Sequence, residues 1–159
     1  MNKIENFTTA ETRFLSNFYP WKNPRGDKYP HIVFVHYAGL FFDCVEVAYQ
    51  AAKAKYLEDM VQISEMDPFQ AKKFADARAF IIRPDWDRVK LPVMKDLVRQ
   101  KFYFSTALGK MLVGTGDAEL LEGNSWGDTF WGICNGVGDN NLGKILMDVR
   151  ERLRQKILR

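Results

Sequence analysis

Helical periodicity is the feature that most constrains what this chain can fold into. Apolar residues recur every three or four positions over residues 44–58, 91–105 and 141–158, which is the spacing of one buried helix face. Two further helices are expected, one over 67–79, where an aspartate–proline pair marks a helix start, and a shorter one over 106–114. The sequence therefore predicts a core made largely of amphipathic helices.

Strand signals are few and short by comparison. Residues 32–37 and 40–42 are rich in β-branched and aromatic residues and flank an Ala-Gly turn, so we expect a hairpin. Residues 3–7 and 119–122 could add short strands. No internal repeat, low-complexity tract or linker interrupts residues 1–159. We therefore predict one α+β domain over 1–159, helix-rich, with a small antiparallel sheet.

Composition excludes several classes of protein. With 159 residues, 47% hydrophobic and 27% charged, the chain is long enough for a core and too polar for a membrane protein. Its N-terminus lacks the apolar run of a signal peptide, which favours the cytoplasm. Two cysteines and two histidines (Cys44, Cys134, His31 and His36) lack the spacing of a zinc site. We expect no metal, no cofactor and no membrane association, and nothing in the sequence sets an oligomeric state.

The positive charge is concentrated at the C-terminus. Residues 144–159 hold six bases and two acids, a net charge of +4, whereas the whole chain carries +3. These bases are interpreted first as a solvated helix face that complements the helix dipole. The alternative is a patch that binds phosphate or nucleic acid.

A stripe of polar residues follows Asp43. Glu46, Gln50 and Lys53 are spaced so that they share one helix face, and Tyr49 lies beside them. A carboxylate, an amide and an amine on one stripe could face a pocket. The structural alternative is that Glu46 forms a capping box with Asp43. From spacing alone, the structural alternative is favoured.

Residues 123–143 combine glycines with tryptophans. Glycines allow close approach of a ligand, and indole rings can stack on a base, so Trp126, Trp131, Gly132 and Asp128 are candidate site residues. The alternative is that the rings fill the core and Asp128 forms a turn. Asn140 and nearby glycines lead into the last predicted helix, whose N-terminus would suit a phosphate.

Five motifs in order resemble the NADAR, or YbiA-like, family. They are Leu-Ser-Asn-Phe-Tyr-Pro at 15–20, Val-Glu-Val-Ala-Tyr-Gln-Ala-Ala-Lys-Ala at 45–54, Asp-Trp at 85–86 followed by Met94 and Lys101-Phe102, Asp-Thr-Phe-Trp-Gly at 128–132, and the run from 140 to 150. The resemblance covers nearly the whole chain. One departure is that Val47 and Ala48 follow Glu46, where family members often have a histidine and an aromatic residue.

The resemblance implies an N-glycosidase. The implied bond joins C1 of a phosphorylated ribose, as a ribosylamine phosphate or as ADP-ribose, to a guanine-like aminopyrimidinone. The implied partner is thus a small nucleotide or an ADP-ribosylated guanine in DNA. Breaking this bond develops positive charge at C1, which a carboxylate stabilises. The implied catalytic residues are Glu46, Asp128 and Lys53, where Lys53 could instead form a Schiff base if burial lowered the pKa of its amine.

The implied substrate-binding residues come from four parts of the chain. They are Asn17, Phe18, Tyr19, Tyr49, Gln50, Trp86, Trp126, Trp131, Gly132 and Asn140. Two other classes of function stay open at this stage. One is a module that binds NAD or ADP-ribose without cleaving it, and the other is a nucleic-acid-binding protein that uses the basic C-terminal helix.

Overall fold

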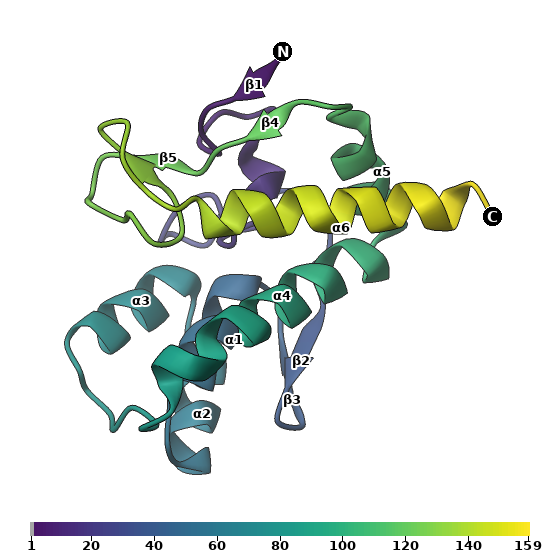
Figure 1. Cartoon of the computed structure of the whole chain (residues 1–159). Helices are drawn as coiled ribbons and strands as arrows, with labels where there is room; N and C mark the ends of the chain where they lie inside the picture. Colours follow the sequence, from purple (N-terminus) through teal and green to yellow (C-terminus); the bar gives the residue numbers. More distant parts are fainter. Residues whose placement is uncertain (1) are drawn as a thin grey trace. The chain divides into compact units, whose positions relative to one another are not determined.

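The computed structural model describes residues 2–159, which form two compact units. Unit 1 consists of the residues up to Ser16 together with Thr106–Arg159, and unit 2 consists of Asn17–Ser105. Figure 1 labels the helices and strands of both units.

Unit 1 is built around the C-terminal helix. Helix α6 packs against helix α5 and strand β4, with Leu146, Val149 and Leu153 among its buried residues. Strand β1 pairs in parallel with β4, and β5 pairs in parallel with β6. The elements are β1 (Lys3–Ile4), the 3-10 helix η1 (Arg13–Leu15), α5 (Thr106–Gly114), β4 (Glu119–Leu120), β5 (Gly123–Asn124), β6 (Ile133–Cys134) and α6 (Asn141–Ile157).

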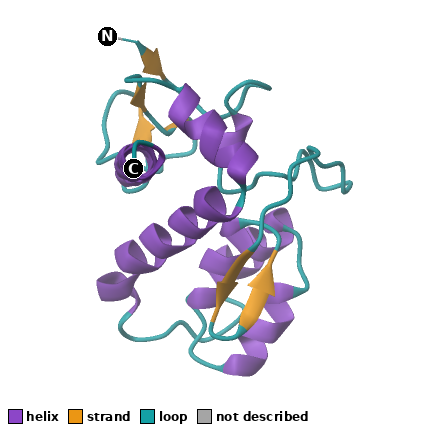
Figure 2. Cartoon of the chain, turned by 90° about the vertical axis from the view of Figure 1, so that its right-hand side faces the viewer, coloured by secondary structure: helices purple, strands orange, loops and turns teal. Residues whose placement is uncertain are grey.

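Unit 2 surrounds one short, fully buried helix. Helix α1 contacts α2, α3, α4 and the hairpin strand β2, and all eight of its residues are buried. Alanines at 48, 51 and 52 leave room for these neighbours to approach closely. Figure 2 shows the hairpin of β2 and β3 as a pair of adjacent strands. The elements are β2 (Val35–Tyr37), β3 (Leu40–Phe42), α1 (Val45–Ala52), α2 (Leu57–Ser64), α3 (Pro68–Asp76) and α4 (Trp86–Phe104).

The predicted fold class, helix-rich α+β, is confirmed, and the predicted hairpin is present. Its turn uses positive φ at Ala38 and Gly39. Within residues 2–159 the strands form three two-stranded sheets, of which the hairpin alone is antiparallel. More than one hundred residues separate β1 from β4, so no tight turn imposes an antiparallel pairing on them. The prediction of one domain over 1–159 stays a prediction.

The helix predicted over 44–58 is two helices. Helix α1 ends at Ala52 and α2 begins at Leu57, because the backbone between them pairs with the segment before α4. There the Lys55 N–H donates to the carbonyl of Ile81, and the Arg83 N–H donates to the carbonyl of Lys53. The chain thus leaves the helix at Lys53.

Helix α4 begins at Trp86, five residues before the predicted start at Leu91, and it contains Pro92 in its interior. The predicted strand 3–7 is shorter, since β1 spans Lys3–Ile4, and the strand predicted at 119–122 is limited to Glu119–Leu120. No helix within residues 2–159 is both long and apolar enough to span a membrane.

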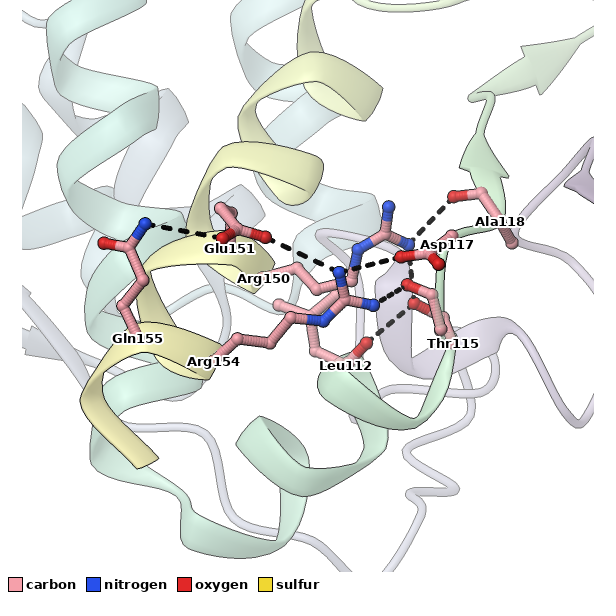
Figure 3. A network of polar contacts seen from close by, with 9 residues as sticks. Leu112, Thr115, Asp117, Ala118, Arg150, Glu151, Arg154 and Gln155 are labelled. Carbon is pink, nitrogen blue, oxygen red and sulfur yellow. Dashed lines mark hydrogen bonds and ion pairs between the residues drawn. The ribbon is translucent and has the colours of Figure 1, made fainter. Parts of the chain in front are cut away.

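Two arginines of α6 tie the helix to the segment between α5 and β4 (Figure 3). Arg150 is buried, and its Nη1 donates to Thr115 Oγ1 and to the Ala118 carbonyl, each at 2.8 Å. Arg154 pairs with Asp117 at 2.9 Å and also donates to the carbonyl of Gly116. The expectation of a wholly solvated basic face is therefore wrong for Arg150, whose guanidinium supplies buried hydrogen bonds within unit 1.

We expect Arg150→Met to destabilise the protein by about 2–3 kcal/mol, because charge-assisted hydrogen bonds are lost and a buried carbonyl is left without its donor. Urea denaturation would measure the loss. The matched control is Arg152→Met, since Arg152 is 64% exposed in its pair with Asp148 and should change stability by less than about 1 kcal/mol. Equal losses in the two variants would contradict a structural role specific to Arg150.

Candidate active site

Glu46 lies in the first turn of α1, and it does not serve as a cap. The N-cap residue is Cys44, and not Asp43. The Glu46 backbone N–H donates to the Asn17 carbonyl at 3.0 Å, while Asp43 accepts a hydrogen bond from Lys28 at 3.2 Å. The predicted capping box is therefore wrong. This segment satisfies its helix start through the backbone and leaves the Glu46 side chain for another role.

The Glu46 carboxylate is buried, with 8% of the residue exposed. Gln50, one turn later on the same face, donates from Nε2 to Glu46 Oε1 at 2.7 Å. Burial raises the pKa of Glu46 above the usual glutamate value, and the hydrogen bond from Gln50 and the charges of Lys72 and Lys53 oppose that rise. A carboxyl group with a raised pKa is a stronger base than an exposed glutamate.

Lys53 follows directly after α1 and lies against two aromatic rings. Its Nζ is 5.0 Å from the ring centroid of Tyr49 and 5.9 Å from that of Trp86. Burial lowers the pKa of Lys53 below the usual lysine value, although the negative charge of Glu46 acts in the opposite direction. Compared with a solvated lysine, Lys53 therefore holds a larger fraction of its amine unprotonated.

Trp86 is held in place at the start of α4. Its ring centroid is 5.1 Å from that of Tyr49 at an interplanar angle of 57°. The preceding Asp85 accepts two hydrogen bonds from Arg83, at 2.6 and 2.9 Å, and Arg83 also donates to the Tyr37 hydroxyl at 2.8 Å. The hydrogen bond from Arg83 lowers the pKa of Asp85, so this pair stays charged and fixes the turn that presents Trp86.

The structure thus brings together five of the predicted residues, which are Glu46, Tyr49, Gln50, Lys53 and Trp86. All five lie in unit 2. We call these five residues the α1 cluster. It combines a buried carboxylate, an amide, an amine and two flat rings.

The predicted residues 17–19 also lie in unit 2, and each has contacts within it. The Asn17 side-chain amide donates to the Met94 sulfur at 3.5 Å, and the Phe18 ring meets Phe69 edge-on. Tyr19 is buried, and its hydroxyl lies 2.6 Å from His31 Nδ1. The Tyr19 ring is therefore packed in the core, stacked on another tyrosine ring.

The remaining predicted residues lie in unit 1. Asp128 Oδ1 accepts hydrogen bonds from the backbone N–H groups of Phe130 and Trp131, at 3.2 and 2.9 Å. Asn124 binds both the N–H and the carbonyl of Asp128. Asp128 thus forms the turn that was the structural alternative, and this turn sets the position of Trp131. A catalytic role for Asp128 stays a prediction.

Asn140 and Gly132 have evident structural roles. The Asn140 side chain accepts from the Glu122 N–H and donates to the Leu120 carbonyl, both at 2.9 Å, so its amide links the loop before β5 to the start of α6. A Cβ on Gly132 would lie 2.1 Å from the Glu122 carbonyl oxygen, so only glycine allows this close approach. Trp126 is 61% exposed. Substrate-binding roles for these residues stay predictions.

Sequence reasoning missed several neighbours of the α1 cluster. Lys72 and Asp76, an ion pair at 3.0 Å on α3, both act on the pKa of Glu46. Their spacing of four residues on an expected helix was the available signal. Arg83, which positions Trp86, gave no signal of its own. Burial raises the pKa of the Cys44 thiol, so this cysteine is a poor candidate for a thiolate nucleophile.

Among residues 2–159, no group of three or more histidine, cysteine, aspartate or glutamate residues could hold a metal ion.

Known proteins show which family the chain resembles. The NADAR domain family matches residues 6–154. An N-glycosidase of Nostoc punctiforme is 37% identical over 125 residues, covering 76% of this chain and 80% of that protein. The N-glycosidase YbiA of Escherichia coli is 32% identical over 144 residues, covering 87% of this chain and 88% of that protein. A riboflavin biosynthesis protein of Vibrio vulnificus is 37% identical over 145 residues, and this match spans 36% of the length of that protein.

A solved structure extends the likeness to the fold. The NMR structure of Escherichia coli YbiA matches 99% of this chain and 89% of that chain, with a TM-score of 0.80 and 29% sequence identity. Fold and relatives together define a hydrolase that acts on N-glycosyl compounds. The chain belongs to the NADAR family.

Proposed function

We propose that this N-glycosidase hydrolyses the C1–N bond between a phosphorylated ribose and a guanine-like aminopyrimidinone. The observation that carries the proposal is the buried Glu46 carboxylate on α1, whose pKa is raised and which interacts electrostatically with Lys53 at the end of the same helix. The names of the relatives, N-glycosidases and a riboflavin biosynthesis protein, support the same class of bond.

In the proposed reaction, Glu46 acts at the anomeric carbon. As the C1–N bond breaks, positive charge develops on the ribose, and a carboxylate that is shielded from solvent stabilises it more strongly than an exposed one would. Glu46 then removes a proton from the attacking water. Water supplies the new C1–OH group, and the departing nitrogen takes a proton, so the products are a free sugar phosphate and a free amine.

Lys53 has a second candidate role, which its lowered pKa favours. An unprotonated amine can add to C1 of the opened ribose, expel the base nitrogen and leave a protonated Schiff base. Water, activated by Glu46, would then hydrolyse the imine and release Lys53. The burial that the Schiff-base route requires is present, since desolvation is the largest effect on this amine.

Tyr49 and Trp86 are proposed to contact the flat base. Trp86 is only partly buried, and an indole face can stack on any pyrimidinone. Each stacked ring contributes about 1–3 kcal/mol to binding in proteins that bind single strands. The Arg83–Asp85 pair would keep the ring of Trp86 oriented before the substrate arrives.

The test of this function offers the purified protein two substrates in parallel. One is the ribosylamine 5-phosphate of an aminopyrimidinone, and the other is single-stranded DNA that carries ADP-ribose on guanine. We expect release of base and sugar from at least one of them, measured by mass spectrometry. Saturable binding of ADP-ribose with no bond cleavage over a long incubation would contradict the proposal and favour a binding module.

A further inference from the structure

Gln50 carries a buried oxygen that the protein leaves without a partner. Only 2% of Gln50 is exposed, and no donor among residues 2–159 reaches its Oε1. A buried amide oxygen without a hydrogen bond costs about 1–3 kcal/mol, so native proteins rarely keep one without a use. The other half of the same amide is occupied, because Nε2 donates to Glu46.

The position of this oxygen follows from that hydrogen bond. Nε2 lies 2.7 Å from Glu46 Oε1. The oxygen and nitrogen of one amide are separated by about 2.2 Å, so Gln50 Oε1 lies within about 5 Å of the Glu46 carboxylate. A ligand with its C1 at Glu46 therefore places the atoms bonded to C1 within reach of Gln50 Oε1.

We propose that Gln50 is a specificity-determining residue whose Oε1 accepts a hydrogen bond from the N–H of the glycosidic nitrogen, so that the enzyme selects N-glycosides of secondary amines. This inference rests on the proposed function. A ribosylamine nitrogen carries one hydrogen, whereas the ring nitrogen of an ordinary nucleoside carries none. A nucleoside in the same place would leave Oε1 buried and unpaired.

The same hydrogen bond would assist the chemistry. An acceptor on the N–H increases electron density at the glycosidic nitrogen, and this nitrogen must push its lone pair toward C1 to open the ribose ring. An N-glycoside methylated on this nitrogen can also open, as a cationic iminium that Lys53 can attack, so the Lys53 route does not itself require the hydrogen. A preference for the N–H substrate therefore reports on the acceptor, Gln50 Oε1.

The test compares a ribosylamine 5-phosphate with its analogue methylated on the glycosidic nitrogen, for the wild-type enzyme and for Gln50→Met. We expect the wild type to prefer the N–H substrate by about 10- to 100-fold in kcat/KM, the range that an unpaired buried acceptor gives. Gln50→Met loses the hydrogen bond to Glu46 whichever substrate is bound. The ratio of kcat/KM for the N–H substrate to kcat/KM for the N-methyl substrate therefore reports on Oε1. In Gln50→Met this ratio should fall to within about threefold of unity. Gln62→Met, on the exposed side of α2, is the matched control and should keep the wild-type ratio.

The outcomes separate this inference from the proposed function. If the wild type cleaves neither compound, the proposed function fails. If it cleaves both with equal kcat/KM, or if Gln50→Met keeps the preference, the specificity role of Gln50 is wrong while the function stands. A third substrate, the 2′-deoxyribosylamine, tests the other nearby donor. Gln50→Met should reduce cleavage of the 2′-deoxy compound by the same factor as cleavage of the ribose compound. If Gln50→Met had no effect on the 2′-deoxy compound, Oε1 would be the acceptor for the 2′-hydroxyl, and the proposal would be overturned.

Discussion

Glu46→Gln is expected to reduce kcat by about 10³-fold, within the range found when a positioned acid or base is removed. Glutamine keeps the shape of the side chain and can still accept the hydrogen bond from Gln50, but it can neither take a proton from water nor carry the negative charge that stabilises C1. Steady-state hydrolysis of whichever substrate the wild type cleaves would measure the loss. Glu65→Gln, an exposed glutamate at the end of α2, is the matched control and should keep wild-type activity.

The melting temperature of Glu46→Gln distinguishes the loss of a catalytic group from a folding defect. Because burial raises the pKa of Glu46 in the folded protein, the folded state binds a proton more tightly than the unfolded state does. The resulting stabilisation is present below the unfolded pKa and is lost as the pH rises through the folded pKa. Once the pH exceeds the unfolded pKa, the burial of Glu46 therefore opposes folding, and Glu46→Gln should melt at the same temperature as the wild type or higher. A variant that is inactive and clearly less stable would contradict the assignment.

The raised pKa of Glu46 also predicts the acid side of the pH profile of kcat/KM. If Glu46 acts as the base, kcat/KM rises with pH as its carboxyl loses the proton, and the midpoint of that rise lies above the usual glutamate pKa. Glu46→Gln should lose this limb. A wild-type profile that is flat on the acid side would assign the proton transfer to another group.

Much of the fold was predictable, because helix faces and turns have local signals. The hairpin turn, the helix start at the aspartate–proline pair of 67 and 68, and the apolar stripe of α6 are all present in the structure. The break after α1 was not predictable, since it depends on backbone pairing with residues 81–83, which lie far along the chain. Long-range pairing of this kind leaves no periodic signal in the sequence.

The site shows the same division. Spacing alone placed Glu46, Gln50 and Lys53 on one face, and the structure keeps Glu46 and Gln50 in contact. Spacing also favoured a capping role for Glu46, which the structure excludes because the N-cap residue is Cys44 and not Asp43. Burial decides between these two interpretations, and burial depends on how α2, α3 and α4 pack around α1. Arg150 shows the converse, because a residue expected on a solvated face lies buried.

Lys53→Met and Lys53→Arg are both expected to reduce kcat by roughly 10³-fold, because neither side chain can form an imine with C1. Arginine keeps the positive charge beside Tyr49 and Trp86, so the pair of variants separates charge from nucleophilicity. Treatment of the wild type with borohydride during turnover should reduce the Schiff base and add the mass of the sugar to the peptide that contains Lys53. Lys55→Arg, an exposed lysine two residues away, is the control and should stay active and still be trapped at Lys53.

The trapping experiment also tests the order of events at Glu46. If Glu46 activates the water that hydrolyses the imine, Glu46→Gln should accumulate the Lys53 adduct, because the imine forms and its hydrolysis is slow. An active Lys53→Arg variant together with no trapped adduct in the wild type would instead show that Lys53 acts through its charge. The C1–N bond would then be broken by direct attack of the water that Glu46 deprotonates, and the lowered pKa of Lys53 would reflect only its burial against the two rings.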